Sequence, residues 1–204
     1  EGYDTSNEDY PVVYLLHGYG DDEQAWYSSG EIQYYSDQYQ GQIVPMIYVM
    51  PSAKNSYYAN KYDGMYSYMD MLTIEMVQVI DELFRTKKDK KYRAAMGYSM
   101  GGYGALILPA LNPEVFSVGV PLSMSFRTDD QYLAEPQNVF DIQWSPIFGG
   151  EGASGQNRLT DHFKQYSPFH FFENQTAGNF SGFKLLIDCG DDEESLSVTN
   201  DRLH

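Results

Sequence analysis

The sequence contains one cysteine, Cys189, among its 204 residues. A single thiol excludes both a disulfide within the chain and a metal site built from cysteines. Cations are also scarce, since 13 Lys and Arg oppose 29 Asp and Glu and give a formal net charge of −16. Nucleic acids and anionic membrane surfaces bind basic patches, so neither is expected as a partner. No apolar run reaches the length of about 18 residues that a membrane-spanning helix needs.

Tyrosine, by contrast, is abundant, with 19 residues, and several of them stand in the polar stretch 56–68. Each ring has an apolar face and a hydroxyl at its tip, which suits a groove for sugars or aromatic rings and equally suits an exposed surface. The composition leaves both roles open. The length predicts a single domain over residues 1–204 with a sizeable core.

Local patterns predict alternating strands and helices. Short apolar runs predict buried parallel strands at 12–16, 46–50, 92–97, 115–123 and 184–189. Apolar residues recur at helical spacing from Asp70 to Phe84, and small residues open another helix after Ser99. Pro109 is expected to interrupt that helix after about two turns, and Asn112-Pro113 to end it. The segment 124–182 has little periodicity and is expected to be a loop-rich excursion over the carboxyl ends of the strands.

This alternation predicts an α/β fold with a mostly parallel central sheet and helices on both faces. In such folds the active site lies where the carboxyl ends of the strands meet the loops. The segments expected to converge there are His17-Gly18-Tyr19, Pro51-Ser52, Ser99, Ser123 and Gly190 to Glu194.

The stretch Gly97-Tyr98-Ser99-Met100-Gly101 fits the pattern Gly-x-Ser-x-Gly. This pattern is typical of a sharp turn between a strand and a helix that exposes a serine hydroxyl at the top of an α/β-hydrolase sheet. Ser99 is therefore predicted to be a nucleophile. A serine hydroxyl reacts only with help from a base within hydrogen-bond reach and a third group that orients the base.

Several segments carry a resemblance to a known family. They are Tyr10 to Gly18, Asp21-Asp22-Glu23 with Trp26, Met50-Pro51-Ser52, Gly97 to Ala105, and Asp188-Cys189-Gly190. With these segments the chain resembles the serine esterases of the feruloyl esterase and esterase D group within the α/β-hydrolases, and most closely the xylan-directed carbohydrate esterases.

The resemblance implies a secreted or periplasmic enzyme that hydrolyses feruloyl or acetyl esters on plant xylan, with no metal or organic cofactor. The polysaccharide or an oligosaccharide would then be its partner, while the oligomeric state stays undecided. Two alternatives remain open: a general short-chain carboxylesterase or S-formylglutathione hydrolase, and a catalytically inactive carbohydrate-binding domain.

The expected site has an oxyanion hole and an acid. Two backbone N–H groups bind the oxyanion, one from the residue after the nucleophile, Met100, and one from the loop after an earlier strand. By resemblance, the second belongs to Tyr19. The family places its acid three residues after the glycine, which is Glu193 here, and the neighbouring Asp192 is the alternative. A solvated acidic turn is the plainer interpretation of this run.

None of the four histidines fits the role of general base. His17 ends a buried strand and is expected to order its loop, whereas His162 and His170 precede the strand that leads to the acid. His204 follows Glu193 by only 11 residues and is expected near the start of a helix. The sequence is therefore expected to be a core fragment, shortened at both ends, with its catalytic histidine beyond His204 and weak hydrolysis on its own.

Overall fold

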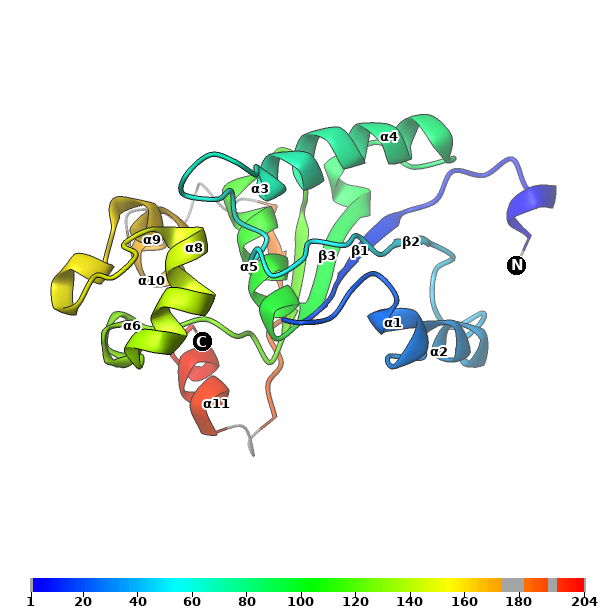
Figure 1. Ribbon diagram of the computed structural model, residues 1–204. Helices are drawn as coiled ribbons and strands as arrows, with labels where there is room; N and C mark the ends of the chain where they lie inside the picture. The colour runs from blue at the N-terminus through cyan, green and yellow to red at the C-terminus, as the bar shows by residue number, and fades with distance from the viewer. Residues whose placement is uncertain (1, 174–181, 191–193, 204) are drawn as a thin grey trace.

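A computed structural model describes residues 2–173, 182–190 and 194–203 (Figure 1). Within them, a parallel sheet has the strand order β2-β1-β3-β4-β5. The strands are β1 Val12–Leu16, β2 Ile47–Val49, β3 Arg93–Tyr98, β4 Val118–Leu122 and β5 Lys184–Leu185. Because the strands are all parallel, their carboxyl ends lie at one edge of the sheet, as the alternating sequence predicts.

Helices connect the strands and surround the sheet (Figure 1). The α-helices are α1 Ala25–Ser28, α2 Ile32–Gln38, α3 Tyr68–Asp70, α4 Met76–Leu83, α5 Met100–Leu111, α6 Asp129–Ala134, α7 Gln137–Val139, α8 Ser145–Phe148, α9 Asp161–Tyr166, α10 Pro168–Phe171 and α11 Glu194–Asp201. Short 3₁₀ turns are η1 Tyr3–Thr5, η3 Lys90–Tyr92 and η5 Gly155–Arg158, and π-helical turns are η2 Met71–Glu75 and η4 Phe140–Trp144. No helix in the described part of the chain is long and apolar enough to cross a membrane.

The predicted elements correspond closely to the observed ones. The η2 turn joins α3 to α4, so a continuous helix runs from Tyr68 to Leu83 where the sequence predicts one from Asp70 to Phe84. The last predicted strand has only two residues in its ladder, but its backbone continues along β4. The N–H of Leu186 donates to the carbonyl of Gly119 at 3.0 Å, and the N–H of Asp188 donates to that of Pro121 at 3.1 Å.

Pro109 does not interrupt α5, so that prediction was wrong. The helix runs on to Leu111 and ends at Asn112, the predicted end. Proline lacks the N–H that would bond the carbonyl of Ala105, and β4 passes close to that carbonyl: a Cβ on Gly119 would lie 2.6 Å from it. Burial of residues 100–110 against the sheet holds the helix together despite the missing bond.

The excursion 124–182 is richer in structure than the sequence predicts. Its described part holds the five short helices α6 to α10, which lie together beside α5 in Figure 1. Their core is a cluster of fully buried aromatic side chains: Phe126, Tyr132, Phe140, Trp144, Phe148 and Phe163. Phe126 stacks on Tyr103 of α5 with 4.3 Å between ring centroids, which fastens the helices to the rest of the core.

Two tyrosines of the 56–68 stretch take neither of the two roles that the composition left open, because they belong to the core. Tyr57 and Tyr58 are fully buried, so neither of them covers the surface. Tyr62 and Tyr66 are exposed. Sequence alone could not separate them, because all four stand among polar neighbours.

Candidate active site

Ser99 lies in the turn between β3 and α5, with φ 54° and ψ −118°. A positive φ is uncommon for a residue with a Cβ, and such strain is found mainly at functional sites. The turn is held from both sides. The N–H of Ser99 donates to the carbonyl of Leu122 at 3.0 Å, and its carbonyl accepts from Ser125 at 3.0 Å. The side chain is partly exposed, so its hydroxyl can meet a substrate.

Glycines allow this turn to sit directly on the strands. A Cβ on Gly97 would lie 2.3 Å from the carbonyl oxygen of Gly101, and one on Gly101 would lie 2.1 Å from that of Leu16. A Cβ on Gly102 would come within 2.6 Å of the carbonyl oxygen of Leu122. Backbone atoms cannot move aside as side chains can, so each of these positions excludes every other residue type.

The change Gly101→Ala is expected to destabilise the fold by about 3 kcal/mol or more, because the methyl group overpacks rigid backbone. Urea denaturation followed by circular dichroism measures this loss. Gly190→Ala is the matched control, since a Cβ there meets nothing within 4 Å. A Gly101→Ala protein as stable as the Gly190→Ala protein would contradict the close packing of the turn.

Backbone amides near Ser99 can form the predicted oxyanion hole. Met100 is the first residue of α5, where an N–H has no acceptor inside the helix and the helix dipole favours negative charge. The close approach of Gly101 to Leu16 and His17 places the loop that carries Tyr19 beside the start of this helix. The Met100 and Tyr19 amides therefore come from two segments packed against each other. Their role as oxyanion donors stays a prediction.

Two contacts that the sequence did not indicate hold the Tyr19 loop. The hydroxyl of Tyr98 donates to the Asp21 carboxylate at 2.6 Å. Burial, and then this bond, raises the pKa of Tyr98 to about 12, so the phenol stays protonated at neutral pH. The side chain of Asn55 accepts from the N–H of Gly20 at 2.8 Å. In the sequence, these two contacts were indicated only by Tyr98 inside the Gly-x-Ser-x-Gly motif and by Asn55 after β2.

His17 orders the same loop, as the sequence predicts. Its Nε2 accepts from the backbone N–H of Ala53 at 3.0 Å, so the proton lies on Nδ1, which donates to the carbonyl of Gly18 at 2.8 Å. The hydroxyl of Tyr58 donates to the carbonyl of His17 at 3.0 Å. Both ring nitrogens are engaged within a fully buried cluster, which leaves neither available as a base for Ser99.

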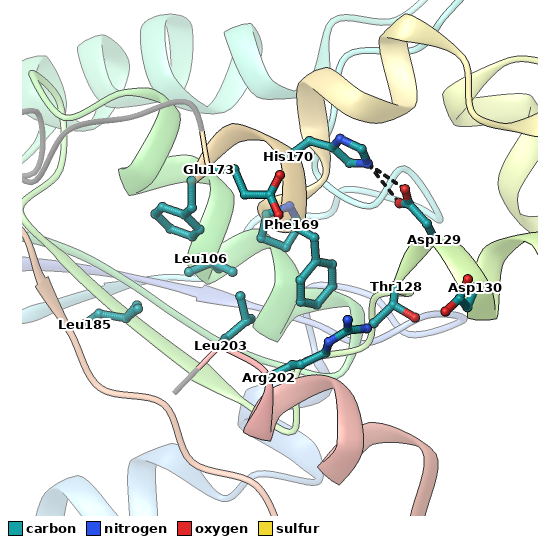
Figure 2. A pocket seen from close by; sticks show the side chains of 12 residues that line it. Leu106, Thr128, Asp129, Asp130, Phe169, His170, Glu173, Leu185, Arg202 and Leu203 are labelled. Carbon is teal, nitrogen blue, oxygen red and sulfur yellow. Dashed lines mark hydrogen bonds and ion pairs between the residues drawn. The ribbon is translucent and has the colours of Figure 1, made fainter.

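The other described histidines also lie in contacts of their own. His162 Nε2 bonds the carbonyl of Asn60 at 2.8 Å. His170 Nε2 contacts both carboxylate oxygens of Asp129, at 2.9 and 3.0 Å, in a separate pocket lined by Leu106 (Figure 2). No residue in the described ranges hydrogen-bonds the hydroxyl of Ser99.

The two candidate acids, Glu193 and Asp192, and the last histidine, His204, lie outside the described residues. The helix predicted after the acids forms as α11, although it begins at Glu194, so the residues after Asn200 are its end and not its start. Asn200 exchanges hydrogen bonds with the backbone of Met124, at 3.2 and 3.0 Å, which anchors α11 beside the loop after β4.

Among the described residues, no group of three or more His, Cys, Asp or Glu side chains could hold a metal ion. Cys189 has intermediate exposure, and its thiol donates to the carbonyl of Gly190 at 3.5 Å.

A strained serine between a parallel strand and a glycine-rich helix is where the sequence pattern predicts a hydrolase nucleophile, and this role of Ser99 stays a prediction. The comparison with protein families agrees with it: the model of the family Esterase, described as "Putative esterase", matches residues 1–202. The chain belongs to the Esterase family. The match covers nearly the whole chain and confirms the resemblance inferred from the sequence motifs.

Individual proteins also show sequence similarity to this chain. A protein of Xylanibacter ruminicola named endo-1,4-beta-xylanase/feruloyl esterase is 34% identical over 114 residues, which is 53% of this chain and 16% of the relative. An acetyl esterase of Caldicellulosiruptor saccharolyticus is 27% identical over 103 residues, 50% of this chain and 37% of the relative. These matched segments thus span well under half the length of the two curated relatives.

Solved structures confirm the fold. An S-formylglutathione hydrolase of Staphylococcus aureus superposes with a TM-score of 0.68 at 26% identity, covering 98% of this chain and 74% of that one. The α/β-hydrolase architecture predicted from the alternating pattern is therefore present.

Proposed function

We propose that the protein is a serine esterase that hydrolyses carboxylic esters through an acyl-enzyme on Ser99. The observation that carries the proposal is the strained, partly exposed Ser99 at the start of α5, in a chain of the Esterase family. Met100 and Tyr19 would supply the oxyanion donors. Glu193 or Asp192 would orient the base, and the base itself would be a histidine from outside the described residues.

In this mechanism, Oγ of Ser99 attacks the ester carbonyl carbon and passes its proton to the base. The carbonyl oxygen takes up negative charge, which the two amides stabilise. Breaking the bond to the alcohol releases it with the proton from the base, and leaves the acyl group on Ser99. Water, deprotonated by the same base, then attacks the acyl group, releases the acid and restores the serine. No redox partner is needed.

As substrates we propose feruloyl or acetyl esters on plant xylan. Similarity to a xylanase/feruloyl esterase and to an acetyl esterase supports this choice. Because such a polymer lies outside the cell, we also propose that the enzyme is secreted or periplasmic. The similarity to an S-formylglutathione hydrolase over 98% of the chain supports a second candidate, the hydrolysis of that thioester.

A substrate panel distinguishes the candidates. The protein, as its gene encodes it, is assayed on methyl ferulate, an acetylated xylo-oligosaccharide, a short-chain nitrophenyl ester and S-formylglutathione. We expect the highest kcat/KM on the first two. A preference for S-formylglutathione would replace the xylan assignment with the second candidate. No turnover of any substrate, together with retained binding to xylan fragments, would contradict the esterase and favour an inactive carbohydrate-binding domain.

A further inference from the structure

A cavity of about 270 Å³ opens beside the loop that carries Tyr19. The rings of Tyr19, Tyr66 and Tyr68 contribute to its wall, and apolar side chains from 142–147 complete it. The backbone N–H of Tyr19 is a proposed oxyanion donor while its side chain lines this cavity. The cavity therefore adjoins the place where the ester would react, and one part of the substrate can reach it.

The loop on one side of the cavity is rigid. Lys54, Tyr57 and Tyr58 all have positive φ angles, of 51°, 52° and 57°. Such strain persists only where the surroundings enforce it, and here Tyr57 and Tyr58 are fully buried. The Asn55 side chain ties the loop to Gly20 at 2.8 Å. Lys54 and Asn55 are thus presented to the cavity by a preorganised backbone.

The charge at this cavity is opposite to that of the chain as a whole. Two lysines, Lys54 and Lys61, line it, and no aspartate or glutamate is among the described lining residues. Lys61 pairs with Asp63 at 2.7 Å. Lys54 is exposed and forms no ion pair with any described residue. Although the net charge of the chain is −16, Lys54 therefore offers one positive charge beside the cavity that is unpaired among the described residues and can attract one negative group.

The remaining lining groups suit a sugar. Tyr19 and Tyr66 keep 40% and 55% of their surface exposed, so their faces are available for stacking against a ring. Gln143 donates through Nε2 to the hydroxyl of Tyr57, which fixes its amide. An amide fixed in this way, together with Asn55, offers hydrogen bonds to hydroxyl groups.

We propose that this cavity is a subsite for the alcohol part of the ester, that it takes a sugar unit bearing a carboxylate, and that Lys54 pairs with this carboxylate. The subsite rests on the proposed esterase function and makes it specific for esters on acidic carbohydrate. Glutathione also carries carboxylates, so the experiment includes it as a separate arm.

Binding of products tests the subsite without requiring turnover. A xylo-oligosaccharide substituted with glucuronic acid and the same oligosaccharide without it are titrated into the protein by calorimetry, and glutathione is titrated in a separate arm. We expect the acidic one to bind about five-fold more tightly, the range of an exposed ion pair, and the advantage to shrink as salt is added. In Lys54→Gln the two should bind equally. Lys88→Gln removes a charge from an exposed lysine remote from the cavity and should change nothing.

Steady-state kinetics of ester hydrolysis then distinguishes binding at the subsite from the chemical reaction. On an acetylated acidic oligosaccharide, Lys54→Gln should raise KM about five-fold and leave kcat unchanged, because the ion pair forms equally in the ground and transition states. Equal binding of both oligosaccharides to the unmodified protein would overturn the subsite, whether or not esters are hydrolysed. If Lys54→Gln weakened the binding of glutathione but not that of the acidic oligosaccharide, the assignment of the subsite to a sugar would be overturned. Lys54-dependent sugar binding without ester turnover would support the subsite and contradict the esterase.

Discussion

Replacing Ser99 with alanine is expected to lower kcat/KM for every ester that the protein hydrolyses by at least about 10³-fold. In the proposed mechanism the hydroxyl forms the acyl-enzyme, and the neighbouring amides would only stabilise an oxyanion that an attack has already created. The loss should fall on kcat, because binding of the ester does not need the hydroxyl. Steady-state kinetics on methyl ferulate and a short nitrophenyl ester measures it.

Ser125→Ala is the matched control for this experiment. The N–H of Ser125 donates to the carbonyl of Ser99, so the control removes a nearby hydroxyl while the backbone of the turn stays held. It should keep activity within about three-fold, a change of well under 1 kcal/mol. Ser99→Ala should also unfold at the same urea concentration as the unmodified protein, since no described residue bonds its hydroxyl. Retained activity in Ser99→Ala would refute the nucleophile.

Alkaline pH is expected to destabilise this protein strongly above about pH 10. Burial raises the pKa of five tyrosines well above the value of about 10 for an exposed phenol: Tyr14, Tyr57, Tyr58, Tyr103 and Tyr132. A raised pKa means that the folded state holds the proton more tightly. Stability is therefore complete below about pH 10 and falls above it, where the unfolded chain ionises first.

The size of this effect follows from linkage. At about pH 11 each of these phenols costs about 1 kcal/mol or more, so the five together cost several kcal/mol. A typical domain has only about 5–15 kcal/mol of stability in total. Circular dichroism against pH follows the fold, and phenolate absorbance follows ionisation. The part of the absorbance rise that comes from the five buried phenols should coincide with the loss of the circular dichroism signal, because unfolding exposes them.

Two phenylalanine variants sharpen the alkaline experiment. The hydroxyl of Tyr132 has no hydrogen-bond partner among the described residues, so Tyr132→Phe removes a titrating group and no bond. Between neutral pH and about pH 11, the stability of this variant should rise by about 1 kcal/mol relative to that of the unmodified protein. Tyr34→Phe, at a side chain 59% exposed, should gain nothing. A free energy of unfolding that stays constant from neutral pH to about pH 12 would contradict the burial of these hydroxyls.

Much of the fold could be predicted from local patterns. Short apolar runs such as Val12–Leu16 predict buried strands because each strand is covered on both faces, and the helix before β3 carries its own periodicity. The turn at Ser99 could be predicted equally well, since only glycine fits where other backbone atoms come as close as they do to Gly97 and Gly101. Each of these signals lies within a few residues of the element that it predicts.

Two predictions were wrong for a different reason: the interruption of α5 at Pro109 and the loop-rich character of the segment 124–182. The persistence of α5 through Pro109 depends on packing against the sheet, which outweighs one missing hydrogen bond. The helices α6 to α10 are held by aromatic rings such as Phe126 and Trp144, whose partners are remote in the sequence. Helices of three to six residues show no clear period, so the segment was expected to be loops.

The sequence by itself determined the family, the parallel sheet and the serine at its edge, because motifs and short apolar runs encode them locally. Only the tertiary structure decided how the site around Ser99 is built. The Tyr98–Asp21 bond spans 77 positions, and the cavity beside Tyr19 joins residues as distant as Lys54 and Gln143. Such contacts depend on where the folded chain places its loops, and no local pattern in the sequence records that placement.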